Sequence, residues 1–261
     1  MTVGLPAVGL GTHGIAEGAI ESALRAGYRL IDTAVSYGNE EQVGAELRAS
    51  GIERERVQIV TKLAGRDHGF RETFAACRAS LRRLGLTYLD LYLIHWPNPH
   101  LDRYVDSWRA MIELRELGLV RAIGVSNFTE RHLTRLVSET GEAPAVNQIE
   151  LHPAWRQDGL RSVHAGLGIA TMAWSPLGRL ATEVPPAVAR IAGERGWSPQ
   201  QVVLGWHAGI GSVPVPRSSH PARQAENLTV HDTLTAHELA AIADLPQERL
   251  WDADPESFRD W

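Results

Sequence analysis

The stretch VQIVTKLAGRDHGFRETFAACRASLRRLGLTYLDLYLIHW, residues 57–96, decides the fold. Its first seven and last eight residues are short apolar runs rich in β-branched and aromatic side chains, which is typical of strands. Between them, residues 71–85 read as a helix that ends at a glycine, the residue best suited to a left-handed helix C-cap. Strand, helix and strand in this order are the repeating unit of an α/β protein with a parallel sheet.

The same alternation continues on both sides of this stretch, and no linker or low-complexity tract interrupts it. The strand-like runs are residues 7–10, 29–32, 57–63, 89–96, 120–127, 145–151, 168–174 and 212–218. Helical segments between them include residues 17–27, 71–85, 104–118, 130–140 and 199–209. Eight βα units in about 250 residues predict a (β/α)8 TIM barrel. We expect residues 1–261 to form one such domain.

Composition limits the class of protein. The 261 residues are 44% hydrophobic and 22% charged, and 31 acidic residues outnumber 26 basic ones to give a net charge of −5. No basic block is present, so neither nucleic acid nor a membrane surface is an expected partner. The N-terminal residues do not resemble a signal peptide, no run approaches the ~20 apolar residues of a membrane span, and Cys77 is the only cysteine. We expect a soluble, cytoplasmic monomer without disulfides, with Cys77 packed on a helix.

A glycine pattern near the N-terminus offers a different fold. Gly9, Gly11 and Gly14 match the dinucleotide-binding spacing G-x-G-x-x-G, and Asp32 lies about 20 residues further on, where a ribose-binding acid would sit. However, Pro6 interrupts the preceding strand, and the βα series continues past six units to eight. The Rossmann interpretation also leaves the polar residues at the ends of later strands unexplained, so the barrel is favoured.

Four titratable residues lie where strands give way to loops. Asp32 and Tyr37 follow the second run, Lys62 is near the end of the third, and His95 ends the fourth. The C-terminal ends of the strands meet at one face of a barrel, which is where barrel enzymes carry their catalytic groups. Each residue alone has an ordinary structural explanation, as a cap, a solvated charge or a packed ring. Together they predict an active site.

These residue types suit the protonation of a developing alkoxide. A tyrosine has a pKa of about 10, so it needs a nearby positive charge to act as an acid near neutral pH. An ammonium about 4 Å away, such as that of Lys62, contributes roughly 4 kcal/mol of attraction to the phenolate. Asp32 can keep that ammonium charged, and His95 can hydrogen-bond a carbonyl oxygen. We therefore expect Lys62 to lower the pKa of Tyr37.

Several motifs together resemble those of the aldo-keto reductases, particularly the bacterial group that contains 2,5-diketo-D-gluconate reductase. The motifs are GYRLIDTAVSYGNEEQVG, VTKL, LDLYLIHWP, IGVSNF, VNQIELHP, SPLG and VPRSSHPARQAENL, and they span nearly the whole chain. The resemblance implies an NADPH-dependent barrel enzyme that reduces aldehydes, ketones or dicarbonyls to alcohols. It makes Tyr37 the proton donor, Lys62 the group that lowers the Tyr37 pKa, Asp32 the partner of Lys62, and His95 the residue that orients the carbonyl.

The resemblance also implies a cofactor site at the remaining strand ends. The residues implied to hold the nicotinamide are Ser126, Asn127 and Gln148, which would bind its carboxamide, and Trp174, on which the ring would stack. Those implied to surround the pyrophosphate are Ser175, Leu177 and Gly178. Those implied to bind the adenosine and its 2′-phosphate are Arg217, Ser218, Arg223, Glu226 and Asn227. Arg217 stands where the family usually has lysine, and it keeps the positive charge.

Departures from the family affect the substrate side. The N-terminal hairpin that usually closes the bottom of the barrel is expected to be truncated or absent, and the loops after SPLG and after His95 are short. His13, Trp96 and Trp155 lie at or near loops that the family uses for substrate. The identity of the substrate therefore stays open.

Two other functions compete with carbonyl reduction. One is a regulatory barrel that binds the cofactor without significant turnover, which the complete set of four strand-end residues disfavours. The other is a metal-dependent hydrolase that uses His95 with Asp32 or Asp90. No second histidine joins His95 at a strand end in a ligand-like pattern, so we expect no metal.

Overall fold

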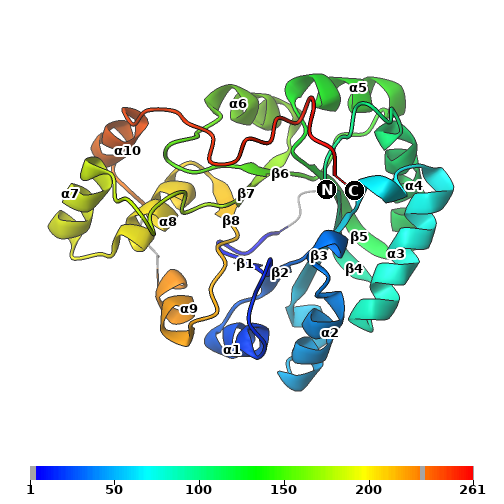
Figure 1. Cartoon of the computed structure of the whole chain (residues 1–261), viewed down its shortest axis with the longest axis horizontal. Helices are drawn as coiled ribbons and strands as arrows, with labels where there is room; N and C mark the ends of the chain where they lie inside the picture. Colours follow the sequence, from blue (N-terminus) through cyan, green and yellow to red (C-terminus); the bar gives the residue numbers. More distant parts are fainter. Residues whose placement is uncertain (1–3, 230–232, 261) are drawn as a thin grey trace.

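The computed structural model describes residues 4–229 and 233–260. Eight parallel strands form one sheet in the order of the chain (Figure 1). They are β1 (Leu10–Gly11), β2 (Leu30–Asp32), β3 (Gln58–Leu63), β4 (Leu89–Ile94), β5 (Val120–Ser126), β6 (Val146–Glu150), β7 (Ala170–Trp174) and β8 (Ser212–Pro214). The predicted (β/α)8 fold is therefore confirmed.

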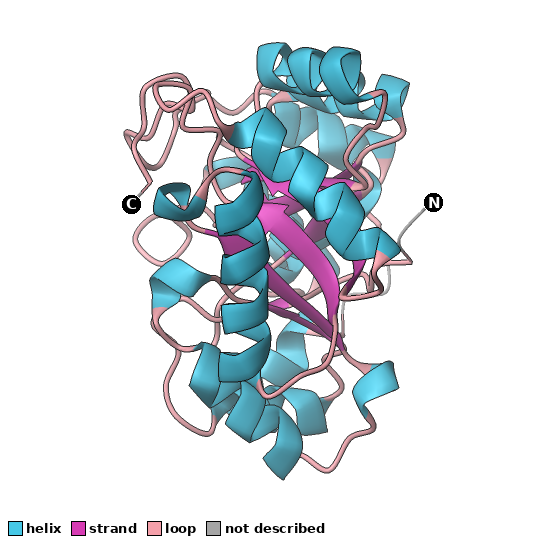
Figure 2. Ribbon diagram, turned by 90° about the vertical axis from the view of Figure 1, so that its right-hand side faces the viewer, coloured by secondary structure: helices cyan, strands magenta, loops and turns pink. Residues whose placement is uncertain are grey.

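Helices surround the strands, as Figure 2 shows with the sheet at the centre. The α-helices are α1 (Ala19–Ala26), α2 (Glu40–Ala49), α3 (Phe70–Leu84), α4 (Tyr104–Glu116), α5 (Glu130–Thr140), α6 (Asp158–Leu167), α7 (Pro186–Arg195), α8 (Pro199–Gly209), α9 (Pro221–Asn227) and α10 (Ala236–Ala243). Short 3-10 helices are η1 (Val35–Tyr37), η2 (Arg54–Arg56) and η3 (Gly65–Asp67). The helical segments predicted from the sequence match α1, α3, α4, α5 and α8 to within two residues at each end.

The two edges of the sheet meet at the glycines of the N-terminal pattern. The backbone N–H of Gly9 donates to Pro214 O at 2.9 Å, and that of Gly11 donates to Pro216 O at 3.2 Å. A Cβ atom on Gly11 would lie 2.6 Å from the backbone oxygen of Val215, closer than such atoms can approach. Glycine is therefore required here by close backbone contact between β1 and the segment after β8, and this contact accounts for part of the pattern that suggested a dinucleotide fold.

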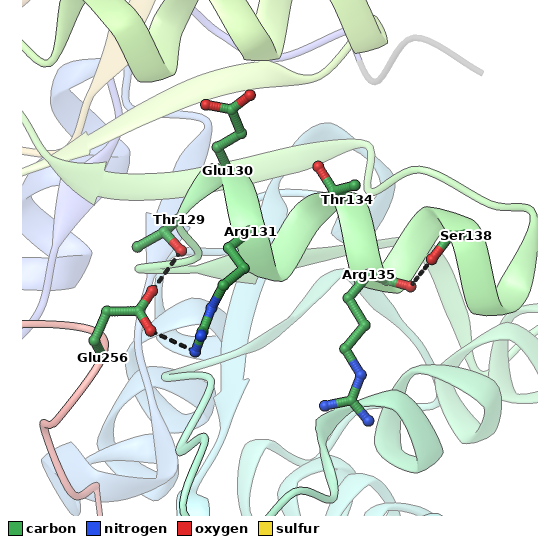
Figure 3. Close-up of a pocket in the computed structure, with 7 residues that line it drawn as sticks. All are labelled: Thr129, Glu130, Arg131, Thr134, Arg135, Ser138 and Glu256. Carbon is green, nitrogen blue, oxygen red and sulfur yellow. Dashed lines mark hydrogen bonds and ion pairs between the residues drawn. The ribbon is translucent and has the colours of Figure 1, made fainter.

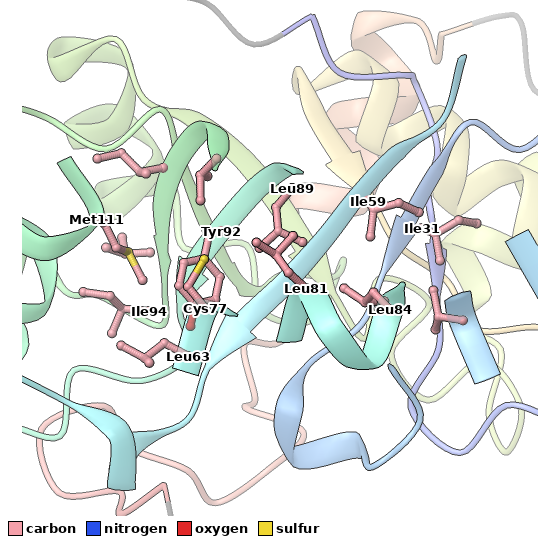
Figure 4. Packing of buried hydrophobic residues seen from close by; sticks show 14 of the residues in the cluster. Ile31, Ile59, Leu63, Cys77, Leu81, Leu84, Leu89, Tyr92, Ile94 and Met111 are labelled. Atoms are coloured by element: carbon pink, nitrogen blue, oxygen red, sulfur yellow. The ribbon is translucent and has the colours of Figure 1, made fainter. Parts of the chain in front are cut away.

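Side chains alternate between the barrel interior and the helix layer. Leu91 and Leu93 belong to the cluster inside the barrel, whereas Tyr92 and Ile94 pack outward against α3 and α4. Figure 4 shows this outer layer, where Cys77 of α3 lies among the apolar side chains. Cys77 is fully buried, and burial raises the pKa of its thiol to about 12. The expectation of a packed, unreactive cysteine agrees with this environment.

The segment before β1 contains no strand within residues 4–9. The N-terminal hairpin was predicted to be truncated or absent. Where this prediction concerns residues 1–3, it lies outside the described residues. Among the helices in the described ranges, none is long and apolar enough to cross a membrane.

Candidate active site

Three of the four predicted catalytic residues form one hydrogen-bonded group. Asp32 is the last residue of β2, Tyr37 ends η1, and Lys62 lies on β3. The Lys62 ammonium donates to Asp32 Oδ2 at 2.8 Å, to the Thr33 carbonyl at 2.9 Å and to the Tyr37 hydroxyl at 3.3 Å. Lys62 and Asp32 are 1% and 2% exposed, so this charged pair is shielded from solvent. The geometry brings a cation against a phenol oxygen, as the sequence predicted.

Lys62 keeps its proton in this setting. Burial by itself lowers the pKa of Lys62, but the Asp32 carboxylate and the Tyr37 oxygen outweigh burial, and the net pKa is raised. Lys62 is also the only lysine in the sequence, and the other basic residues counted with it are all arginines. The chain therefore places its single ammonium in the interior, at this site.

The pKa of Tyr37 differs from the sequence-based expectation. Burial raises this pKa, the charge of Lys62 lowers it, and burial wins, so the net pKa lies above the ordinary value for tyrosine. The expected effect of Lys62 has the right direction but is smaller than the desolvation cost of a phenolate at this position, although the Tyr37 side chain is only half-buried. At neutral pH Tyr37 is consequently held as a neutral phenol, the form that can give up a proton.

His95 lies beside this group, in the loop that follows β4. Its ring centroid is 6.0 Å from that of Tyr37, and the two rings meet edge to face. The Asn127 side chain donates to the His95 carbonyl at 3.0 Å, which fixes the backbone at this point. The Nδ1 atom of His95 lies 3.2 Å from Asp260 Oδ2 and 3.4 Å from the Ser36 hydroxyl.

Two of the three predicted substrate residues lie next to the catalytic group. The ring of His13 meets Tyr37 edge to face at 5.0 Å, and the ring of Trp96 is 6.4 Å from that of His95. Trp155 lies elsewhere: it contacts the Arg249 guanidinium and lines a cavity of ≈ 50 Å³ together with Asn127 and Trp174. Its place is therefore beside the predicted nicotinamide residues rather than beside Tyr37.

The predicted nicotinamide residues form a connected row of polar groups across β5, β6 and β7. Trp174 Nε1 donates to Asn127 Oδ1 at 2.8 Å, and the Ser126 hydroxyl donates to the Gln148 carbonyl at 2.9 Å. Gln148 Nε2 donates to Asp32 Oδ1 at 2.8 Å, which links the row to the catalytic group. Asn127 has φ +61, an unusual left-handed backbone conformation that turns the chain at the end of β5.

The residues predicted for the pyrophosphate follow β7. Ser175 has φ +48, and its hydroxyl accepts a hydrogen bond from Trp251 Nε1 at 3.3 Å. Leu177 is half-buried, and Gly178 packs closely over the ring of His152. These residues line one turn of chain directly after Trp174.

The residues predicted for the adenosine end follow β8 and continue into α9. Arg217 and Arg223 are exposed, whereas Ser218 and Asn227 are buried, and Glu226 is half-buried. The Arg217 guanidinium donates to the His13 carbonyl at 3.2 Å. The segment thus presents two arginines to solvent on the side of the barrel where β8 meets β1.

Three residues near the site were missed by the sequence reasoning, and all lie after the last helix. Asp260 contacts His95, Phe258 stacks on Trp96 with centroids 4.1 Å apart, and Trp251 contacts Ser175. No strand or helix pattern marks this segment, so only its aromatic and acidic residues could have indicated a role.

The metal-dependent alternative would require a cluster of ligands. Within residues 4–229 and 233–260, no three His, Cys, Asp or Glu side chains are placed so that they could hold a metal ion.

A surface hollow lies along α5, where Figure 3 shows Arg131 turned toward Glu256 and away from Arg135. Both arginines are paired with acids, and the hollow contains none of the four predicted catalytic residues.

The model of the Aldo/keto reductase family matches residues 15–246. The chain belongs to the aldo-keto reductase family. This reductase is 49% identical to 2,5-diketo-D-gluconic acid reductase B of Corynebacterium sp. (strain SHS752001), over 97% of this chain and 93% of that protein. It is 47% identical to an aldo-keto reductase of Mycolicibacterium smegmatis (strain ATCC 700084 / mc(2)155), over 97% of this chain and 94% of that one.

Solved structures of other aldo-keto reductases superpose closely on this one. An aldo/keto reductase from Brucella melitensis gives a TM-score of 0.88 at 45% identity, covering 92% of this chain and 94% of that chain. An aldo-keto reductase from Bombyx mori in complex with NADP gives a TM-score of 0.88 at 38% identity, covering 98% of this chain and 94% of that chain. The barrel of this reductase is therefore the family's barrel over almost its whole length.

Proposed function

We propose that this reductase uses NADPH to convert aldehydes, ketones or dicarbonyls to alcohols, with Tyr37 as the proton donor. The observation that carries the proposal is the position of the Lys62 ammonium, 2.8 Å from Asp32 and 3.3 Å from the Tyr37 hydroxyl. An ammonium fixed there before the reaction stabilises the phenolate left when the proton departs. The raised pKa of Tyr37, which burial causes, keeps the donor protonated until substrate arrives.

The chemistry balances with the groups at hand. NADPH, when bound, supplies the hydride to the carbonyl carbon, and the electron pair of the C=O bond moves to oxygen. Tyr37 gives that oxygen its proton, and His95 orients the carbonyl by a hydrogen bond. Asp32 holds Lys62 in place, because its Oδ2 atom accepts from the ammonium while its Oδ1 atom accepts from Gln148.

The polar row across β5–β7 suits the nicotinamide end of the cofactor. A carboxamide needs both donors and acceptors, and Ser126, Asn127 and Gln148 offer both. Trp174 is half-buried and held by Asn127, so one aromatic face can be fixed against the nicotinamide ring. Arg217 and Arg223 suit the 2′-phosphate that distinguishes NADPH from NADH, with Ser218, Glu226 and Asn227 beside them. The turn of Ser175, Leu177 and Gly178 suits the pyrophosphate.

The substrate class follows from the relatives more than from the pocket. The similarity to a 2,5-diketo-D-gluconic acid reductase makes keto-sugar acids, including 2,5-diketo-D-gluconate, the first candidates. His13 and Trp96 lie beside Tyr37 and His95 and are proposed to contact the substrate. Trp155 is proposed to contact the substrate from the side of the barrel that carries Asn127 and Trp174. A single domain spanning residues 1–261, a monomeric state and a cytoplasmic location stay predictions.

The test is NADPH oxidation by the purified protein with a panel of small aldehydes, diketones and keto-sugar acids. We expect turnover of at least one class, and loss of most of it in Tyr37→Phe. A protein that binds NADPH but oxidises it with no carbonyl in the panel would contradict the proposal and favour a cofactor-binding regulatory barrel.

A further inference from the structure

The C-terminal tail, residues 247–260, crosses the face of the barrel that carries the candidate site (Figure 1). Its start is fixed where the Leu250 N–H donates to the buried carboxylate of Glu150 at the end of β6. Its middle is fixed where Glu256 accepts hydrogen bonds from Thr129 and Arg131 (Figure 3). Phe258 then stacks on Trp96. The tail is therefore attached along its length and ends beside His95.

The position of Asp260 is set by several independent contacts. The buried side chain of Asn98 donates to the Asp260 carbonyl at 2.8 Å and accepts from the Asp260 N–H at 3.0 Å. The Gly65 N–H donates to Asp260 Oδ2 at 3.0 Å. A Cβ atom on Gly65 would lie only 2.0 Å from the Asp260 carbonyl oxygen, so glycine leaves the space that this residue fills. The fold thus provides a specific seat for an acid at position 260.

That seat places a carboxylate against one nitrogen of His95. Asp260 Oδ2 is 3.2 Å from His95 Nδ1, and both side chains are largely shielded, at 13% exposure for His95 and 9% for Asp260. An ionised carboxylate can only accept, so Nδ1 has to carry the proton in this contact. The Ser36 hydroxyl, at 3.4 Å from the same nitrogen, could instead donate to it, but a charged acceptor at a shorter distance is the stronger partner.

The protonation of Nδ1 decides what the other nitrogen can do. With a proton on Nδ1, a neutral imidazole presents a lone pair at Nε2, and a carbonyl oxygen cannot donate to it. Nε2 becomes a donor when the ring carries both protons. While Nδ1 donates to Asp260, Nε2 of His95 can therefore donate to a substrate carbonyl only in the imidazolium form.

We propose that Asp260 is a positioning residue for carbonyl reduction, which keeps His95 as an imidazolium that donates from Nε2 to the substrate oxygen. This inference rests on the proposed function. Asp260 touches neither substrate nor cofactor in this scheme and acts through His95. The pairing makes the end of the tail part of the site.

The other charged groups around His95 do not replace Asp260. Tyr37 from η1 lies beside His95, with the Lys62–Asp32 pair behind it. His68, directly after η3, interacts electrostatically with His95, Asp260, His100 and Arg103, and Asp67 interacts with Asp260. Arg103 and His100 oppose positive charge on His68, which is kept neutral because burial lowers its pKa to about 4. Asp260 is the carboxylate that lies directly against His95 Nδ1 in the described part of the chain.

The first measurement is made on the free protein and requires no turnover. In protein labelled with ¹⁵N-histidine, the His95 signals are identified by their loss in His95→Gln, and their shifts report the proton on each nitrogen as pH changes. We expect His95 to lose its second proton at a lower pH in Asp260→Asn than in the wild type, because the variant lacks the carboxylate that lies against Nδ1. Asp252→Asn removes the same charge from an exposed position in the same tail and is expected to match the wild type.

The second measurement is the pH profile of kcat/KM with a carbonyl that the wild type reduces. We expect the alkaline limb to move toward acid in Asp260→Asn by the same amount as the NMR transition, while Ser36→Ala and Asp252→Asn keep the wild-type limb. Asn98→Ala keeps the carboxylate but removes its backbone seat, so it should move the limb in the same direction.

The outcomes separate the inference from the proposed function. If Asp260→Asn overlays the wild type in both measurements, or if Ser36→Ala moves the limb and Asp260→Asn does not, the inference is wrong. If the NMR transition moves but the wild type reduces no carbonyl, the proposed function fails and the catalytic role of Asp260 fails with it.

Discussion

Gln148 donates its side-chain N–H to Oδ1 of Asp32 at 2.8 Å, deep in the barrel. The other oxygen of that carboxylate accepts from Lys62. One residue of the proposed nicotinamide row therefore shares a carboxylate with the proposed proton-donor group. A shift of the Gln148 amide on cofactor binding would therefore change the hydrogen bonding of Asp32, and through Asp32 the position of the Lys62 ammonium that faces Tyr37.

Replacing Tyr37 by phenylalanine should abolish most carbonyl reduction and leave NADPH binding nearly unchanged. The substitution removes the hydroxyl that faces Lys62, and the ring can remain between His13 and His95. General acid catalysis typically contributes 10²–10⁴-fold, so a loss of about that size is expected in kcat. Turnover assays and fluorescence titration of NADPH measure the two effects. Near-normal turnover of an unactivated aldehyde would mean that another group is the acid.

Replacing Lys62 by methionine should reduce both turnover and stability. The change leaves the buried Asp32 carboxylate with its hydrogen bond from Gln148 but without its cation, and breaking a buried ion pair in this way costs about 3 kcal/mol. Urea unfolding measures the loss of stability. Asp32→Asn should be milder in turnover, since the ammonium remains near Tyr37. A pH profile of Lys62→Met that overlays the scaled wild type would rule out the proposed coupling to the phenol.

The protonation of Lys62 can be observed without mutation. Because the chain has a single lysine, ¹⁵N-lysine labelling gives one Nζ signal. The folded-state pKa is raised by Asp32, so this signal should stay that of an ammonium up to and beyond the ordinary pKa of about 10.5. The matching contribution to stability is present below that pH and is lost as pH rises through the folded-state pKa. A signal that titrates below pH 9 would contradict the raised pKa.

NADPH should bind on the order of a hundredfold more tightly than NADH. Two charge-assisted contacts from Arg217 and Arg223 to the 2′-phosphate, at roughly 1.5 to 3 kcal/mol each, account for a preference of this size or larger. Arg217→Ala and Arg223→Ala should each weaken NADPH selectively, and Arg190→Ala on α7 serves as the exposed control. Fluorescence titration measures all of these affinities. Equal wild-type affinities for the two cofactors would remove these arginines from the phosphate site.

Acid should destabilise the fold through its buried histidines. Burial lowers the pKa of His207 to about 3, and those of His164 and His68 to about 4. An unfolded histidine has a pKa of about 6.5, so below that pH the unfolded chain binds protons that the folded chain does not. Stability is therefore expected to fall as pH drops from about 6.5 to about 4. Urea midpoints across this range measure the slope, which should become shallower in His164→Asn.

Closure of the barrel gives a prediction about stability alone. A Cβ atom at position 11 would meet the backbone oxygen of Val215, so Gly11→Ala should lower the free energy of unfolding by about 1–3 kcal/mol. Gly193 of α7 has open space around it, and Gly193→Ala should be neutral or stabilising by up to about 1 kcal/mol. Equal urea midpoints for Gly11→Ala and the wild type would show that the joint tolerates the added atom.

The barrel and the catalytic group could be predicted because their signals are local. Each buried strand is a short apolar run, and a polar residue such as Lys62 or His95 stands out where the run ends. The contact that joins β1 to the segment after β8 could not be predicted in this way, since Gly11 and Val215 lie at opposite ends of the chain. The net pKa of Tyr37 also escaped prediction, because the sequence shows a nearby charge but not the depth of burial.

Asp260 shows the limit most clearly. It contacts Gly65 and Asn98 across 195 and 162 positions of sequence, and no periodic pattern connects residues so far apart. Its segment lies in neither helix nor strand. The acid is placed by the tail as a whole, through contacts at Leu250, Glu256 and Phe258, and such a path becomes visible only in the folded chain.

The burial of the single lysine should protect the protein from covalent modification by aldehydes. Aldehydes condense with neutral amines to form Schiff bases, and exposed lysines are the usual targets. Here the only ε-amine is buried and held as an ammonium, so an aldehyde cannot reach it and it has no free lone pair. Prolonged exposure to a reactive aldehyde followed by borohydride should leave Lys62 unmodified, and any covalent damage should fall on arginine or the α-amine instead.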